Sequence, residues 1–360
     1  MKKIIVILSV FLLMVLGCAT PDTTTQETTT IKVGVLGPFS GDAASYGESI
    51  KNGIEVGLEA SGLDNIELVI EDSKCDGKEA VSAVNKLISL DGVQAIVGGV
   101  CSGGTLAAAP IAEQNQVPMV SPSSTSPDIT DAGDYLFRVV PSDAFQGAFG
   151  AKLVYDKGYR KLGVLYSNED YGVGFNKVLS ENFAELGGEV VASEAHERTS
   201  VDLRAQITKV KEAGADAVYI ISNSADSAVA AMKQIKELGL EVALFGSEGL
   251  KGDVITDNAG DTAEGLFVTS VSGGTQAFID AHNAKFESNP GPFAAQGADA
   301  IQAIAWAIKL GASTGAEIKD NLYKVEFEGD SGSIKFDENG DVFGSYEVFV
   351  VKDGAFVAEE

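Results

Sequence analysis

Short apolar runs alternate with amphipathic segments along the chain from Ile31 onward. The first apolar runs, which predict buried strands, cover 31–36, 66–71, 93–97 and 117–121. Between them, 49–58 and 79–90 carry apolar residues three and four positions apart, the spacing of one helical face. This alternation predicts a parallel sheet whose strands are joined by crossover helices.

The same pattern restarts after residue 160. Further strands are predicted at 162–167, 190–192, 217–222, 242–245 and 266–271. A helix-rich stretch follows over 276–310, and then a pair of strands at 333–336 and 346–352. The prediction is an α/β fold of two doubly wound lobes joined by a hinge. We expect one lobe to comprise 31–142 and 274–327, and the other 143–273 and 328–360.

The N-terminus has the features of a secretory signal peptide spanning 1–17. Two lysines precede an apolar run from Ile4 to Val15, which is too short to span a membrane comfortably. Val15-Leu16-Gly17-Cys18 resembles the lipobox of prokaryotic lipoproteins, in which the cysteine is lipidated and becomes the new N-terminus. The alternative is an ordinary signal peptide with a cysteine there by chance.

The segment 18–30 is rich in threonine and lacks apolar periodicity, which predicts a disordered tether. Fully extended at about 3.3–3.6 Å per residue, it would reach roughly 40 Å. We therefore expect a protein at the extracytoplasmic face of the cell envelope, anchored to the membrane by lipid on Cys18. Of the three cysteines, Cys75 and Cys101 then remain, and two thiols in an oxidising compartment predict one disulfide.

Composition narrows the choice of partners. The chain has 52 acidic and 26 basic residues, a balance that disfavours binding to nucleic acid or to an anionic lipid surface. Its two histidines, His196 and His282, lie outside any metal-spaced cluster, and we expect both at the surface. We expect neither a metal nor a cofactor.

Ligands of open parallel sheets bind at the carboxyl ends of the strands. The loops after the predicted strands are rich in small hydroxyl residues, and they also contain aromatic, amide and acidic side chains. The candidate ligand-binding residues from these loops are Tyr46, Ser102, Ser123, Ser124, Thr125, Tyr171, Asn223 and Glu248.

Hydroxyls and helix-start N–H groups suit a small anion such as a carboxylate, and a lone acid in an opposite loop can pair with an ammonium. Each loop alone could serve only to cap a helix or form a turn. The glycine-rich GGVCSGGT lacks the Lys-Ser/Thr ending of a phosphate-binding loop. No histidine or lysine lies near Ser102 in the sequence, which weighs against a nucleophilic serine.

Six segments, in order and spacing, resemble the substrate-binding proteins of branched-chain amino-acid ABC transporters, which are type I periplasmic binding proteins. They are IKVGVLGPFSGDAASYG, DSKCDGKEAV, GGVCSGGT, VSPSSTSPDIT, YGVGF and FGSEGL. The resemblance extends over about 31–350. It implies that two lobes close on an amino acid without chemistry, and that Cys75 and Cys101 form the family's disulfide.

The resemblance also implies roles for the candidate residues. Ser102 and Thr125 would offer hydroxyls to the ligand, and Ser123 and Ser124 would offer main-chain groups. Glu248 would pair with the ammonium. Tyr171 would close over the ligand, and Tyr46 would line the side-chain region.

One position departs from this pattern, because Asn223 stands where leucine-type binders tend to have an aromatic residue. This puts branched-chain specificity in doubt, so we expect a small amino acid or a related zwitterion as the ligand. The predicted function is capture of that ligand and delivery to an ABC permease. Alternatives are a ligand-sensing regulator of the same fold and, less favoured, a lipoprotein hydrolase using Ser102.

Overall fold

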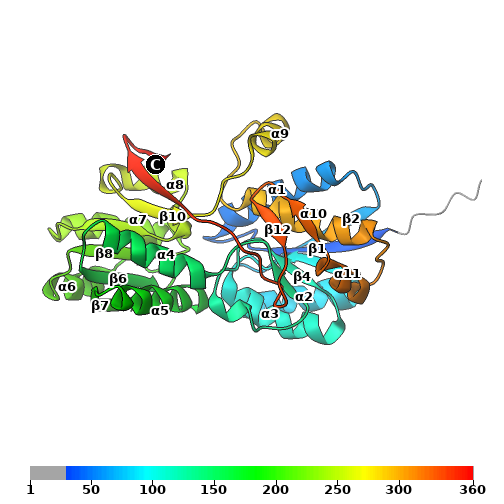
Figure 1. Cartoon of the computed structure of the whole chain (residues 1–360), viewed down its shortest axis with the longest axis horizontal. Coiled ribbons are helices and arrows are strands. Elements are labelled where there is room, and N and C mark those ends of the chain that lie inside the picture. The colour runs from blue at the N-terminus through cyan, green and yellow to red at the C-terminus, as the bar shows by residue number, and fades with distance from the viewer. Residues whose placement is uncertain (1–29, 360) are drawn as a thin grey trace, which may run out of the picture.

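The computed structural model describes residues 30–359 as two α/β lobes, which lie side by side in Figure 1. The predicted signal peptide, Cys18 and all of the predicted tether except Thr30 lie outside the described residues. In the described part of the chain, no helix is both long and apolar enough to cross a membrane.

The first lobe is built on a parallel sheet with the strand order β2-β1-β3-β4-β5. Its strands are β1 (Ile31–Gly37), β2 (Ile66–Asp72), β3 (Ala95–Gly98), β4 (Met119–Ser121) and β5 (Leu136–Arg138). Its helices are α1 (Ala44–Ser61), α2 (Gly77–Lys86), α3 (Ser102–Asn115), α9 (Gln276–Phe286), α10 (Ala294–Lys309) and α11 (Gly315–Leu322). Short helical turns, η1 (Leu87–Asp91) and η2 (Pro127–Ile129), complete it.

The second lobe has the strand order β14-β13-β10-β9-β8-β6-β7. Its strands are β6 (Lys161–Ser167), β7 (Glu189–His196), β8 (Ala217–Ile221), β9 (Ala243–Gly246), β10 (Phe267–Ser270), β13 (Glu347–Lys352) and β14 (Ala355–Ala358). Its helices are α4 (Asp143–Asp156), α5 (Asp170–Glu185), α6 (Arg204–Glu212), α7 (Ala225–Glu237) and α8 (Asp253–Ala259), with turns η3 (Glu248–Leu250) and η4 (Gly260–Thr262).

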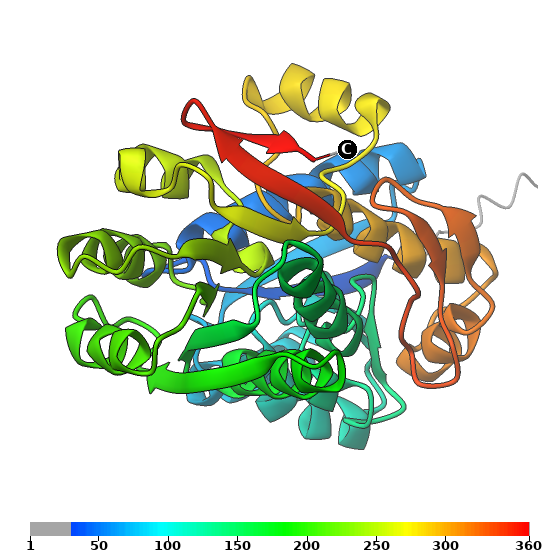
Figure 2. The same cartoon turned by 60° about the vertical axis from the view of Figure 1, so that its left-hand side comes forward.

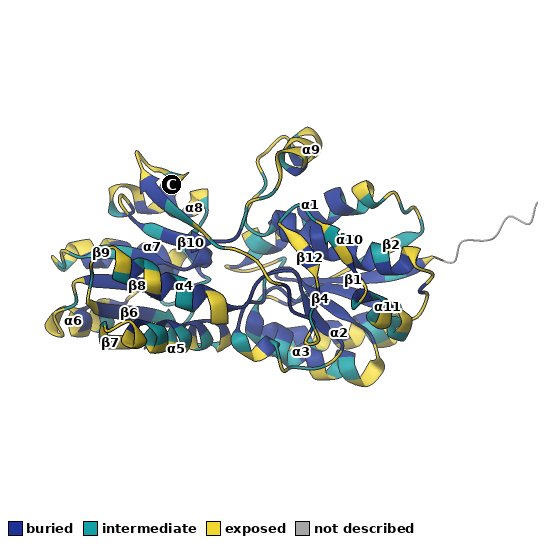
Figure 3. Ribbon diagram, viewed as in Figure 1, coloured by how far each residue is buried: buried dark blue, intermediate teal, exposed yellow. Residues whose placement is uncertain are grey.

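Both lobes therefore use the same doubly wound arrangement of five parallel strands, with helices covering the sheet. The buried strands run through the middle of each lobe in Figure 3, and the exposed faces belong largely to helices and loops. The predicted α/β fold is confirmed. In α1, the predicted apolar face is buried at Ile50 and Ile54. Gly53 lets α1 approach α10 closely, since a Cβ there would lie 1.8 Å from the carbonyl oxygen of Ala294.

The late strands differ from the prediction in their pairing. Residues 333–336 and 346–352 were expected to form a pair, but β12 (Ser333–Lys335) pairs with β11 (Glu326–Glu328), whereas β13 pairs antiparallel with β10 and β14. Figure 2 shows β13 and β14 at the edge of the second lobe. The intervening segment crosses between the lobes, so the two predicted strands end in different sheets.

In the described part of the chain, three crossings connect the lobes: the segments after β5, after β10 and before β13. Ile334, Phe336 and Val342 pack in the hydrophobic core around β1 and α10. These contacts place 334–342 with the first lobe, although the predicted boundary at 327/328 assigned them to the second. The remaining lobe boundaries stay as predicted assignments.

Candidate functional site

A cleft between the lobes collects loops from the carboxyl ends of both sheets. From the first lobe it is lined by Ala43, Tyr46, Val100, Cys101, Ser102, Ser123 and Phe293, and from the second by Tyr171, Asn223, Glu248 and Gly249. Six of the eight candidate residues thus lie together, although their contact with a ligand remains a prediction.

Ser124 and Thr125 lie behind the lining. The Ser124 hydroxyl is 2.6 Å from the Thr105 hydroxyl, and its N–H donates to Ser121 Oγ at 2.9 Å. These bonds hold Ser124 within the first lobe, so it supports the binding loop from inside. Thr125 is buried, and its side chain lies beside the carboxylates of Asp143 and Glu248.

Ser102 begins α3, and no side chain caps the start of that helix. Its Oγ accepts a hydrogen bond from the N–H of Ser126 at 3.3 Å, which leaves the hydroxyl proton available for donation. Unpaired N–H groups at a helix start carry partial positive charge. This side of the cleft is therefore a donor surface suited to a carboxylate.

The loop that carries Ser123 to Ser126 rests on a buried guanidinium. Arg138 is fully buried and donates to the carbonyl oxygens of Thr125 at 3.2 Å and Ser126 at 2.9 Å. It also pairs with both carboxylate oxygens of Asp341, at 2.6 and 2.8 Å. Because Asp341 lies on the way to the last crossing, Arg138 links the binding loop to the hinge.

The opposite side of the cleft carries the carboxylate of Glu248, and a second carboxylate, that of Asp143, lies buried behind the lining and close enough to interact with it. Glu248 begins η3 and is 4% exposed, and Asp143 begins α4 and is fully buried. Within residues 30–359, neither Asp143 oxygen has a hydrogen-bond partner, nor has Glu248 Oε2. Burial raises the pKa of Glu248, and burial together with the nearby charge of Glu248 raises the pKa of Asp143.

Further unpartnered buried atoms gather around these acids. They are the Tyr171 hydroxyl, Ser247 Oγ, Asn223 Oδ1 and Gln146 Oε1. Buried polar groups in folded proteins are normally hydrogen-bonded, so a cluster without partners marks a site completed by another molecule. With Asp143 and Glu248 among them, most of these atoms are acceptors, which calls for a ligand rich in donors.

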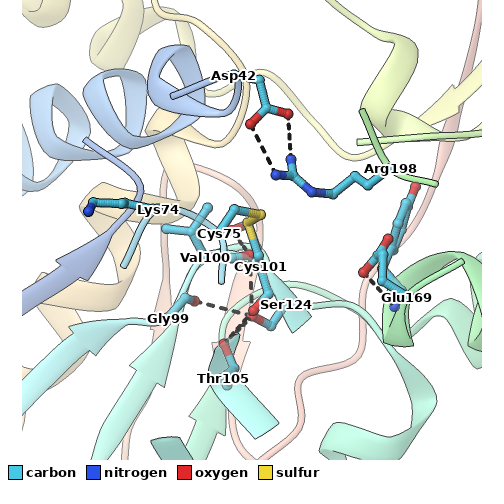
Figure 4. Close-up of a disulfide and its surroundings, with 12 residues drawn as sticks. Asp42, Lys74, Cys75, Gly99, Val100, Cys101, Thr105, Ser124, Glu169 and Arg198 are labelled. Atoms are coloured by element: carbon cyan, nitrogen blue, oxygen red, sulfur yellow. Dashed lines mark hydrogen bonds and ion pairs between the residues drawn. A yellow bond between two sulfur atoms is a disulfide. The ribbon is translucent and has the colours of Figure 1, made fainter. Parts of the chain in front are cut away.

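The predicted disulfide between Cys75 and Cys101 is confirmed, with Cα atoms 5.4 Å apart. Figure 4 shows it beside Val100 and the start of α3. It ties the loop after β2 to the residue just before Ser102, and so restrains the donor surface of the cleft.

Two polar contacts close the cleft from lobe to lobe. The Tyr46 hydroxyl donates to the carbonyl oxygen of Gly249 at 2.8 Å. Arg198 forms a double ion pair with Asp42, at 2.6 and 3.0 Å (Figure 4). Close packing adds to them, because a Cβ on Gly174 would lie 2.9 Å from Pro127 Cδ. The structure therefore represents a state in which the lobes touch across the cleft.

Both histidines are buried, so the predicted surface placement was wrong. His196 is 4% exposed and His282 is 1% exposed. Nδ1 of His196 lies 2.9 Å from the carbonyl oxygen of Glu197, and Nδ1 of His282 lies 2.9 Å from that of Ser288. The described residues contain no group of metal-ligating side chains that could hold an ion.

Sequence reasoning missed Asp143, Arg138 and Phe293. The first two flank the crossing after β5, a three-residue strand that the apolar pattern did not indicate. Since candidates were sought only after predicted strands, this loop was passed over. Phe293 lies in the segment before α10 and reaches the cleft from outside the strand-end loops.

Two lobes around a cleft with donors on one side and acceptors on the other define a ligand-binding protein of the hinged type. A family model described as periplasmic binding protein matches residues 30–355. The chain belongs to this family, whose members bind ligands and are not enzymes.

Three relatives with named ligands are similar to this chain over most of its length. A leucine-, isoleucine-, valine-, threonine- and alanine-binding protein from Pseudomonas aeruginosa is 33% identical over 327 residues, covering 87% of each chain. A leucine-binding protein from Thermotoga maritima superimposes with a TM-score of 0.87 at 30% identity, covering 92% of this chain and 98% of the other. A branched-chain amino acid transporter substrate-binding protein from Streptococcus pneumoniae, in complex with isoleucine, gives 0.83 at 31% identity, covering 92% and 100%.

Proposed function

We propose that this protein captures a small or aliphatic α-amino acid and delivers it to an ABC permease. The observation that carries the proposal is the opposed polarity of the cleft. Ser102 and the start of α3 offer donors, whereas Glu248 offers an unpaired carboxylate oxygen, with the buried carboxylate of Asp143 close behind it. An α-amino acid carries one carboxylate and one ammonium, which match these two surfaces.

Capture of the amino acid requires only that the two lobes close over it. With the lobes together, the cleft excludes water, which strengthens the contacts between charged groups. The contacts of Tyr46 with Gly249 and of Arg198 with Asp42 join the lobes in this state. A permease that recognises the closed form would then receive only loaded protein.

The ligand class draws support from the relatives. Their names include leucine, isoleucine and valine, and in one case threonine and alanine. The apolar part of the cleft, formed by Ala43, Val100 and Phe293, suits a short aliphatic side chain. Placement outside the cytoplasmic membrane, with a lipid on Cys18, completes the proposal.

Mass spectrometry of the ligand retained by gently purified protein tests this function. An α-amino acid present in about one-to-one ratio is the expected result. A retained ligand without an ammonium group, or turnover of an ester or amide substrate, would contradict the proposal.

A further inference from the structure

The side-chain amide of Asn223 is a polar group of the cleft that the two carboxylates do not explain. Asn223 lies in the loop between β8 and α7 and lines the cleft. The residue as a whole is half-buried, but its Oδ1 is buried and has no hydrogen-bond partner among the described residues. Burying an unpaired amide is unfavourable, so this atom indicates a missing partner.

Two neighbouring hydroxyls already donate to main-chain carbonyl oxygens, and the Tyr171 hydroxyl, which also lines the cleft, lies beside Ser247 and Glu248. The Tyr46 hydroxyl donates to the carbonyl oxygen of Gly249, and the Ser222 hydroxyl donates to the carbonyl oxygen of Ser224 at 3.2 Å. Gly249 packs against Asn223, since a Cβ on Gly249 would lie 3.4 Å from Asn223 Cα. The remaining lining nearby, Ala43 and Phe293, has no side-chain polar atom.

We propose that Asn223 determines specificity by hydrogen bonding to a hydroxyl group on the side chain of the bound amino acid. A hydroxyl both donates and accepts, so it can pair with either end of the amide. The cleft should therefore prefer threonine over valine, which has the same shape but a methyl in place of the hydroxyl. This inference rests on the proposed function, because it concerns the side chain of the same amino acid.

The size of the preference follows from the unpaired amide. A site built to hydrogen-bond a hydroxyl rejects the analogue that lacks it, because its own buried polar group is left without a partner. That loss corresponds to roughly 5- to 150-fold in affinity. Replacing the amide by an apolar group of similar size removes the reason for the preference.

Calorimetric titration of the purified protein with L-threonine and L-valine tests the proposal, using the wild type, Asn223→Leu and the control Asn85→Leu. Asn85 is exposed on α2 and is not among the residues that line the cleft. We expect threonine to bind at least about fivefold more tightly than valine to the wild type and the control. In Asn223→Leu the ratio should fall to about one or invert.

Equal affinities in the wild type would overturn the role of Asn223 while leaving amino-acid binding intact. An unchanged ratio in Asn223→Leu, with a melting temperature close to that of the wild type, would do the same. Failure of the wild type to bind either amino acid, or any other in a panel, would overturn the proposed function and this inference with it.

Discussion

Glu248 provides the most informative single perturbation, because its carboxylate should serve binding at the expense of stability. It is 4% exposed, and its Oε2 has no partner within the described residues. Removing one member of a buried charge pair costs about 2–5 kcal/mol. Glu248→Ala should therefore weaken amino-acid binding roughly 30- to 4,000-fold, and Glu248→Gln should do so without leaving a cavity.

The ligand-free protein should respond in the opposite direction. Glu248→Gln removes the buried negative charge and keeps a polar group of the same size, so it should stabilise the empty protein at pH values above the raised pKa of Glu248, where the wild-type carboxylate is charged. The pH dependence follows from the raised pKa values of Glu248 and Asp143. Between the unfolded and the folded pKa the native state holds more protons, so these groups lower the stability of the empty protein as pH rises.

Ligand affinity has the reverse dependence on pH. An ammonium requires ionised carboxylates, so binding should weaken as pH falls through the raised pKa values. Calorimetry and thermal unfolding across pH 5–8 measure both effects, with Glu185→Gln, an exposed site on α5, as the control. Affinity of Glu248→Ala within about threefold of the wild type would refute the pairing of Glu248 with the ligand.

Three other predictions follow from the lobe contacts, the disulfide and the N-terminus. Asp42→Asn should speed ligand release in stopped-flow measurements, because the ion pair between Asp42 and Arg198 stabilises the closed state. For the same reason, added salt should lower the ligand affinity of the wild type more than that of the variant. Equal release rates of the two proteins would contradict this role of the ion pair. Replacing Cys75 and Cys101 by serine should lower the free energy of unfolding by about 3–4 kcal/mol, measured by denaturant titration, and a change below about 1 kcal/mol would contradict the estimate. Cys18→Ser should move the protein from the membrane fraction to the soluble fraction, and a variant that stays membrane-bound has another anchor.

Much of the fold could be predicted because its signals are local. Short apolar runs alternating with amphipathic helices indicated the two doubly wound lobes, and the strand ends located six lining residues of the cleft. Strand pairing was less accessible, since β13 pairs with β10, which lies far away in the sequence, and β12 pairs with β11, a three-residue strand that the apolar pattern did not indicate. The three-residue strand β5 was too short to stand out.

The predicted set of site residues was incomplete because the missing residues depend on a short strand and on distant contacts. Asp143 follows β5, so missing that strand meant missing an unpaired carboxylate. The role of Arg138 depends on Asp341, which is 203 residues away in the sequence. Burial of the two histidines was also invisible, because they lie among polar neighbours in the sequence yet pack within the folded lobes.

The cleft should bind both charged groups of a free α-amino acid, the carboxylate at Ser102 and α3 and the ammonium at Glu248. Calorimetric titration with threonine or valine, whichever binds more tightly, and with its N-acetyl and C-terminal amide derivatives tests it directly. The first derivative lacks the ammonium that Glu248 and Asp143 should bind, and the second lacks the carboxylate that Ser102 and α3 should bind. We predict that each derivative binds at least about 30-fold more weakly than the free amino acid. Binding of either derivative as tightly as the parent would contradict the account.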